Sequence, residues 1–152
     1  MATTGDDTPL FLDTNVLIYA SVREAPEHET VRRFVENRLV EGRMLCISRQ
    51  VLREYLAVLS RSRGEAQAVA RETLLVWLTV WRDRCRVLDD TAPVMETLWR
   101  LYDQTPFGGK QVHDANIVAT MLAYGLDTLV TANTSDFQRF APPLTLIDPR
   151  RP

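Results

Sequence analysis

Five short apolar runs, separated by longer segments with helical spacing, constrain the fold of this chain more than any other feature. The runs are predicted strands at residues 10–13, 44–47, 87–88, 128–131 and 145–147. A short apolar run bounded by turn residues is typical of a strand that is buried on both faces. Strands that alternate with helices favour an α/β fold with a parallel sheet covered by helices. The order of the strands in the sheet does not follow from one sequence.

Apolar stripes and capping residues place the helices between these strands. The expected helices cover residues 14–21, 27–41, 49–61, 65–81, 91–102 and 112–124, with one further helical turn at 135–140. Ser48 is a good N-cap for the third helix, and Gly125 is a typical stop for the sixth. In open α/β sheets, ligands bind outside the carboxyl ends of the strands. Residues that directly follow a strand are therefore the first candidates for a functional site.

Length and composition indicate one globular domain. The chain has 152 residues, of which 45% are hydrophobic and 25% charged, as in an ordinary globular protein. We expect a flexible N-terminal tail at residues 1–9 and a single domain at residues 10–148. The tail lacks the basic and apolar regions of a signal peptide, and no apolar run approaches the roughly 18 residues of a membrane span. Cys46 and Cys85 show no metal-site spacing, so reduced thiols in the cytoplasm are expected.

The charges are unevenly distributed along the chain, although the net charge is only −2. The balance is −4 over residues 1–42, +5 over residues 43–86 and −3 over residues 87–152. A basic middle segment is either a surface that faces phosphates or a set of solvated helix faces. Charge alone leaves both interpretations open.

Two carboxylates stand where apolar side chains are expected. Asp13 ends the first strand directly after three apolar residues, where a buried charge needs a partner. Glu54 shares one helix face with Val51 and Val58, and so interrupts an apolar stripe. Each also has an ordinary structural explanation. Asp13 is a possible N-cap of the next helix, and Glu54 a possible glutamate at the rim of the stripe.

Two further carboxylates follow the same pattern later in the chain. Asp114 tops an apolar helix face, in the first turn where the helix dipole favours an anion. Asp136 follows the fourth strand through a polar turn that also contains Asn133, which is placed to orient a ligand or a water. A helix-capping role for Asp114 and a turn role for Asp136 are the simpler alternatives.

Taken together, the four carboxylates predict a site for a hard divalent cation. Carboxylates that share a pocket repel one another unless a cation is present. Oxygen ligands of this kind suit Mg²⁺ or Mn²⁺, whereas no cluster of cysteine and histidine indicates zinc. A divalent ion held by acids, with a metal-activated water as nucleophile, is the usual arrangement for phosphodiester hydrolysis.

Four stretches of the sequence resemble the PIN-domain ribonucleases, in particular the VapC-type toxins of bacterial toxin–antitoxin modules. They occur in the order of that family, and the match spans residues 10–147. The stretches are FLDTNVLIY at 11–19, SRQVLREYL at 48–56, VHDANIVA at 112–119 and LVTANTSDF at 129–137. The resemblance implies a three-layer α/β/α sandwich with a central parallel sheet of four to five strands. It also implies a Mg²⁺-dependent or Mn²⁺-dependent endoribonuclease.

The same resemblance implies roles for individual residues and partners. Asp13, Glu54 and Asp114 take the catalytic and metal-binding positions, and Asp136 is expected as the fourth, because Asn133 stands where many members have an Asp. Supporting roles fall to Asn15, Thr131 and Asn133, and possible RNA contacts are Lys110, Arg49 and Arg53. The expected partners are an RNA substrate, a VapB-type antitoxin and a second copy of the chain in a homodimer, with no membrane. The RNA target does not follow from the sequence.

Two other functions are compatible with parts of the sequence. A PIN-like module with weak or no catalysis, acting only within a complex, is the main alternative, since Asn133 is neutral. A phosphotransfer or phosphatase site with Asp13 as nucleophile is disfavoured, because the haloacid-dehalogenase opening has a second Asp where this chain has Asn15.

Overall fold

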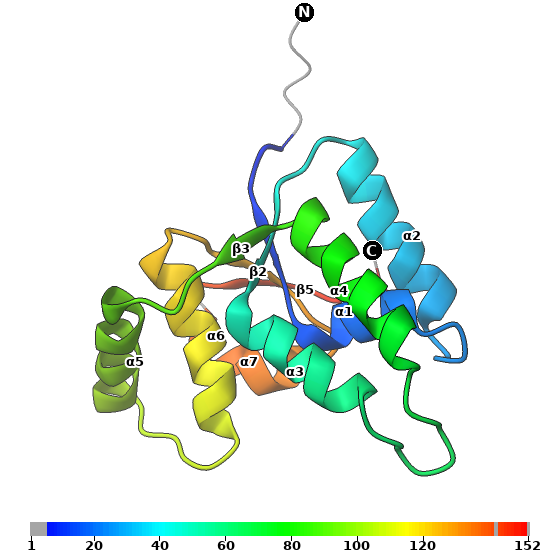
Figure 1. The fold of residues 1–152 in the computed structure, drawn as a ribbon. Coiled ribbons are helices and arrows are strands. Elements are labelled where there is room, and N and C mark those ends of the chain that lie inside the picture. Colours follow the sequence, from blue (N-terminus) through cyan, green and yellow to red (C-terminus); the bar gives the residue numbers. More distant parts are fainter. Residues whose placement is uncertain (1–5, 142, 152) are drawn as a thin grey trace, which may run out of the picture.

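A five-stranded parallel sheet runs through the middle of the molecule (Figure 1). The computed structural model of the chain describes residues 6–141 and 143–151. The strands lie in the order β3-β2-β1-β4-β5, and every neighbouring pair is parallel. Their bounds are β1 Leu10–Leu12, β2 Leu45–Ser48, β3 Arg86–Leu88, β4 Thr128–Val130 and β5 Thr145–Ile147.

The three central strands form the core of the fold. Every residue of β1, β2 and β4 is buried, as expected for parallel strands that are covered on both faces. Phe11 of β1 lies opposite Cys46 of β2 on one side and Leu129 of β4 on the other. Both cysteines, Cys46 and Cys85, are free and buried.

Helices cover the sheet on both sides. Their bounds are α1 Thr14–Ser21, α2 His28–Val40, α3 Arg49–Leu59, α4 Arg71–Arg84, α5 Ala92–Gln104, α6 Gln111–Ala123 and α7 Thr134–Phe137, followed by the 3₁₀ turn η1 Gln138–Phe140. The crossovers from β1 to β3 move in one direction along the sheet, and those from β3 to β5 move in the other. Right-handed crossovers therefore place α1 to α4 on one face and α5 to α7 on the opposite face. Figure 1 shows α5 and α6 at one side of the molecule and α1, α2 and α4 at the other.

This arrangement confirms the predicted three-layer α/β/α sandwich, with five strands. Within the described residues, none of the helices is long and apolar enough to cross a membrane. Residues 1–5 of the expected tail lie outside the described residues. Residues 6–9 have no regular secondary structure, and the Arg43 guanidinium donates to the carbonyl oxygen of Thr8 at 2.7 Å.

The start of α4 differs from the sequence prediction. The helix begins at Arg71, whereas the apolar spacing predicts a start near residue 65. The intervening residues form a closed turn instead, with a bridge between Arg63 and Ala66. The Val69 amide donates back to the carbonyl oxygen of Leu59 at 2.8 Å, so the backbone has partners outside a helix.

The strand order creates a switch point between β1 and β4. The chain leaves β1 toward β2 and leaves β4 toward β5, in opposite directions along the sheet. Ligands of open α/β sheets bind in the crevice at such a point, outside the carboxyl ends of the strands. The helix α6 precedes β4 and runs back along the sheet, which brings its first turn to the same edge.

Candidate active site

Asp13 stands at the carboxyl end of β1 and caps α1. Its carboxylate accepts hydrogen bonds from the Thr14 amide at 2.7 Å, the Thr131 hydroxyl at 2.8 Å and the Asn15 side-chain amide at 3.2 Å. Only 7% of the residue is exposed. The N-cap explanation offered by the sequence is thus correct, and the same side chain also contacts the end of β4.

Burial makes ionisation of Asp13 unfavourable. Burial, with a smaller contribution from the negative charge of Glu54, raises the pKa of this carboxyl from 3.8 to about 6. The hydrogen bonds from Thr131, Thr14 and Asn15 lower the pKa and offset part of this effect. Asp13 is therefore a carboxylate that positive charge would stabilise.

The Thr131 hydroxyl joins the ends of β1 and β4. It donates to Asp13, and it accepts from the Asn15 side chain at 3.3 Å and from the Asn133 amide at 3.0 Å. The Asn15 side-chain oxygen in turn accepts from the Ala132 amide at 3.0 Å. The structure thus brings two of the three predicted supporting residues, Asn15 and Thr131, into direct contact at the switch point. Asn133 takes part through its backbone, and its side chain is exposed.

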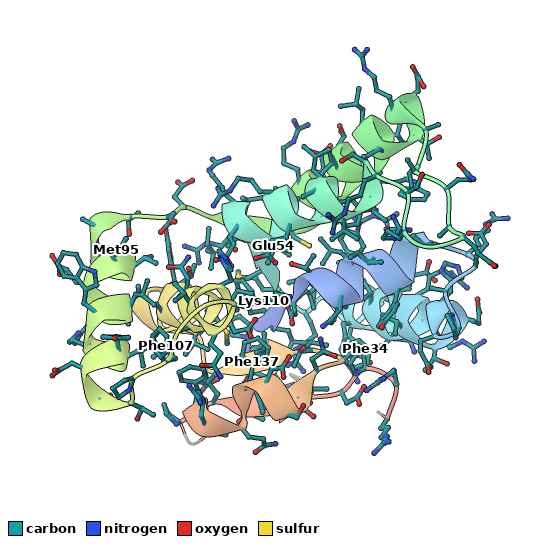
Figure 2. The ribbon with its side chains drawn as sticks, turned by 90° about the horizontal axis from the view of Figure 1, so that it is seen from below. Phe34, Glu54, Met95, Phe107, Lys110 and Phe137 are labelled. Atoms are coloured by element: carbon teal, nitrogen blue, oxygen red, sulfur yellow. The ribbon has the colours of Figure 1, made fainter. Side chains whose placement is uncertain are left out.

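Glu54 reaches the site from α3, the helix that follows β2. Ser48 caps this helix by accepting from the Val51 amide at 3.2 Å, as its sequence predicts. One Glu54 oxygen accepts from the Thr14 hydroxyl at 2.7 Å, and the other accepts from the Gln50 side chain at 2.8 Å. Glu54 is labelled on α3 in Figure 2. Its carboxylate is half-buried rather than extended into solvent.

Asp114 lies in the first turn of α6 and is influenced by the other three acids. Burial, together with the negative charges of Asp13, Asp136 and Glu54, raises the pKa of Asp114 from 3.8 to about 6. The neighbouring His113 lowers it. The elements that carry these four carboxylates meet where β1 and β4 end, so the structure brings the predicted acids together at one edge of the sheet.

Asp136 completes this group from the rim. It lies in α7, on the segment that follows β4, and its side chain is exposed. Of the two residues considered for the fourth position, Asp136 is the one whose charge acts on Asp114. Its role in binding an ion stays a prediction.

The donor set fits Mg²⁺ or Mn²⁺ held partly through water. Within residues 6–141 and 143–151, no three side chains of His, Cys, Asp and Glu are close enough to hold an ion directly. Mg²⁺ does not need such a cage, because it is bound by one or two carboxylates and keeps several waters. Asp13 and Asp114 are the two carboxyls whose pKa burial and neighbouring acids raise to about 6. They are accordingly the residues that would hold the ion, and Glu54 and Asp136 would contact it through water.

The three predicted RNA contacts differ in their surroundings. Lys110 precedes the first turn of α6 and is exposed; it is labelled in Figure 2. Arg53, next to Glu54 on α3, is also exposed. Arg49 instead forms an ion pair with Asp89, which follows β3. Lys110 and Arg53 are thus the more accessible cations for an RNA phosphate.

Three polar side chains of the site were not singled out by the sequence. Thr14 and Gln50 hold the two oxygens of Glu54, and the Asn116 side chain donates to the Gln50 carbonyl oxygen at 2.7 Å. The spacing of Gln50 and Glu54, four residues apart on a helix, is a signal for their contact. The contact between Gln50 and Asn116 joins residues 66 positions apart, and no local pattern reveals it.

A sizeable pocket lies away from the acidic residues. It is bounded by α1, α2 and α4, with Ser21, His28, Trp77 and Trp81 among its lining residues. None of the four carboxylates lines it. The chemistry of the candidate site is therefore indicated by converging charges and by the switch point, not by the size of a cavity.

Comparison with known proteins identifies the family. The family model described as PIN domain matches residues 10–142, most of the chain. The chain belongs to the PIN-domain family. It is 31% identical over 135 residues to Ribonuclease VapC24 of Mycobacterium tuberculosis, and the match covers 86% of this chain and 90% of that protein. The resemblance predicted from the four sequence stretches is confirmed.

Solved structures share the PIN fold with this chain. VapBC2 from Rickettsia felis, bound to a DNA fragment from its promoter, matches with a TM-score of 0.66 and 24% identity, over 91% of this chain and 97% of the matched chain. VapBC-1 from nontypeable Haemophilus influenzae matches with a TM-score of 0.68 and 20% identity, over 95% and 100%. At these identities the likeness establishes the fold.

Proposed function

We propose that this PIN-domain chain is a divalent-metal-dependent endoribonuclease that acts as the toxin of a toxin–antitoxin pair. The observation that carries the proposal is the gathering of Asp13, Glu54, Asp114 and Asp136 at the carboxyl ends of β1 and β4. The similarity to a protein named as a VapC ribonuclease supports the choice of RNA as substrate.

In this mechanism the acidic side chains have different roles. Asp13, fixed by three hydrogen bonds, and Asp114 would hold a divalent ion. A divalent ion, when bound, stabilises charge on the phosphoryl oxygens and makes water a stronger nucleophile. Glu54 is positioned by Thr14 and Gln50 and accepts the proton of the attacking water. Lys110 and Arg53 bind RNA phosphates beside the reacting bond.

A VapB-type antitoxin and a second copy of the chain are the proposed protein partners. The antitoxin is supported by the structures of similar fold, which are those of VapBC proteins. A homodimer is supported by apolar side chains that the fold leaves at the surface, including Leu56 and Leu75, which are 43% and 53% exposed. Leu59, Leu74 and Trp81 from the same pair of helices are buried in the core instead. We place the activity in the cytoplasm, where the RNA substrate is found.

Cleavage of purified total RNA tests the proposed function. Antitoxin-free protein is incubated with Mg²⁺, with Mn²⁺ and with EDTA, beside Asp114→Asn. The matched control is Asp103→Asn, which replaces an exposed carboxylate on α5. We expect discrete products with the wild type and the control variant, and none with EDTA or Asp114→Asn.

Other results would contradict the proposal in different ways. Products that persist with EDTA and in Asp114→Asn would place the activity elsewhere in the sample or in the chain. Folded wild-type protein that cuts no RNA with either ion, and that binds neither ion, would favour a PIN-like binding module without catalysis.

A further inference from the structure

The buried side-chain amide of Gln50 connects Glu54 on α3 with the backbone beside Asp114 on α6. Gln50 is only 6% exposed and lies one helical turn before Glu54 on α3. Its side chain contacts Glu54 on the same helix, and it also contacts the backbone of the neighbouring helix α6. We infer that Gln50, oriented by Asn116, is a positioning residue that fixes the Glu54 carboxylate relative to Asp114. The inference rests on the proposed metal-dependent cleavage.

The hydrogen bonds of Gln50 define one orientation of its amide. Its nitrogen donates to Glu54 Oε1 at 2.8 Å and to the His113 carbonyl oxygen at 2.9 Å, which uses both amide protons. Its oxygen accepts from the Asn116 side-chain nitrogen at 2.7 Å. If the amide turned over, its oxygen would face the Glu54 carboxylate and the His113 carbonyl, both of which are acceptors. Asn116 therefore selects the orientation in which Gln50 can hold Glu54.

Glu54 is thereby fixed at both of its oxygens. Gln50 holds Oε1, and the Thr14 hydroxyl holds Oε2 at 2.7 Å. Thr14 directly follows Asp13, and His113 directly precedes Asp114. Each hydrogen bond to Glu54 thus comes from a group that is tied to the backbone beside another acid of the site. The two bonds set the spacing of three carboxylates carried by β1, α3 and α6.

A purely structural role would not require this amide. A buried amide is unfavourable unless its hydrogen bonds are made, and an apolar side chain of similar volume would fill the same space between α3 and α6. A fully satisfied polar network specifies a single arrangement of its members. The presence of a polar side chain at residue 50 therefore indicates that its role is to orient Glu54. Groups that orient the ligands of a metal site change metal affinity or activity by about 10- to 100-fold when they are removed.

The test compares Gln50→Met with a matched variant of the same helix. Methionine has a similar volume but no amide protons. Tyr55→Phe is the control, because it removes the hydrogen bond of a fully buried side chain to Ser21 Oγ at 2.8 Å and leaves both hydrogen bonds of Glu54 in place. Each purified chain is measured for Mn²⁺ affinity without RNA by calorimetry, for its urea midpoint in EDTA, and for kcat and KM on RNA with Mn²⁺.

We expect Gln50→Met to weaken Mn²⁺ binding by about 10- to 100-fold and to lower kcat by a similar factor, with KM for RNA within about twofold of the wild type. Tyr55→Phe should lower the urea midpoint by at least as much as Gln50→Met does, yet keep the Mn²⁺ affinity and kcat of the wild type. Asn116→Ala, which frees the Gln50 amide to turn over, should fall between Gln50→Met and the wild type in Mn²⁺ affinity and in kcat. Asn116 contacts Gln50 and makes no hydrogen bond to Glu54. Asn116→Ala therefore also tests the inference if Gln50→Met does not fold.

The possible failures can be told apart. If the wild type binds Mn²⁺ and cuts RNA, and Gln50→Met and Asn116→Ala do both equally well, the positioning inference is overturned while the proposed function stands. Equal losses of Mn²⁺ affinity in Tyr55→Phe and Gln50→Met would mean that any destabilisation of α3 weakens metal binding. That result also overturns the inference. A wild type that neither binds Mn²⁺ nor cuts RNA overturns the proposed function and the inference with it.

Discussion

Replacing Asp13 by Asn is expected to stabilise the metal-free protein at neutral pH. The folded chain buries this carboxyl, which raises its pKa from 3.8 to about 6. Below about pH 3 the carboxyl is protonated in the folded and the unfolded chain alike. Between about pH 4 and pH 6 the unfolded chain has released this proton while the folded chain keeps it, so the free energy of unfolding falls as the pH rises. Above about pH 7 this penalty is complete and constant.

The size of the stability penalty follows from the shift in the pKa of Asp13. A difference of roughly two pKa units, at about 1.4 kcal/mol each, corresponds to a penalty of about 3 kcal/mol at pH 7.5. Asparagine avoids the penalty and, with its oxygen in the place of Asp13 Oδ2, still accepts from Thr131 and Asn15. Its side-chain nitrogen, in the place of Oδ1, cannot accept from the Thr14 amide, and the loss of this cap costs about 1 kcal/mol. The net gain is about 2 kcal/mol.

Urea denaturation followed by circular dichroism measures this gain. With an m-value of about 2 kcal/mol/M, the midpoint of Asp13→Asn should lie about 1 M above that of the wild type at pH 7.5 in EDTA. At pH 4 the variant should show no gain, because the carboxyl of the folded wild type then keeps its proton and little of the penalty is present. Asp103→Asn, on the exposed face of α5, should change the free energy of unfolding by less than about 0.5 kcal/mol at either pH.

Divalent ions should reverse the order of stability. Mn²⁺ at about 100 times its dissociation constant adds about 2.7 kcal/mol to the wild type by mass action, whereas Asp13→Asn lacks a residue that holds the ion. A variant that is less stable than the wild type in EDTA at pH 7.5, or a difference that is the same at pH 4, would refute the reasoning that burial of this charge destabilises the folded chain.

Three other predictions concern α3, the end of α6 and the pH dependence of the site. Ser48→Ala removes the cap of α3 and should lower the free energy of unfolding by about 1 kcal/mol; an unchanged urea midpoint would contradict it. Gly125 ends α6 with a φ of 72°, so Gly125→Ala should destabilise the chain by about 1–2 kcal/mol, and a stabilised variant would show that this strain is absent. Because protons compete for the carboxyls of Asp13 and Asp114, Mn²⁺ affinity measured by calorimetry should be constant above pH 7 and fall by about tenfold per pH unit for each carboxyl below pH 6. A constant affinity from pH 5 to 7 would argue that these two groups do not hold the ion.

The sequence predicts those parts of the site that carry a local signal. Asp13 is visible because a charge directly follows a buried strand, and Glu54 and Asp114 are visible because each interrupts an apolar helix stripe. Alternating strand and helix patterns predict the layers of the fold for a similar reason, since burial imposes a period on each element. The acids, the helix cap at Ser48 and the α/β/α class all belong to this group.

The remaining features depend on which strands are neighbours. The bond from Thr131 to Asp13 spans 118 positions and exists because β4 lies beside β1. Likewise, β3 lies beside β2, and Arg49, which follows β2, pairs with Asp89, which follows β3, so it is less free for RNA than its sequence suggests. Gln50 reaches His113 only because α3 and α6 start at the same sheet edge. Strand order is set by the packing of the whole chain, which no local pattern contains.

The most direct test of a shared metal-dependent site is single-turnover cleavage of one labelled RNA while Mn²⁺ is titrated from EDTA-treated protein. Asp13→Asn and Asp114→Asn are measured beside Asp103→Asn, and circular dichroism establishes that each is folded. We predict a cleavage rate that saturates with Mn²⁺ for the wild type and Asp103→Asn, and a rate at least about 100-fold lower for the other two variants at every concentration. A wild-type rate that does not depend on Mn²⁺, or full cleavage by both Asp13→Asn and Asp114→Asn, would contradict the account.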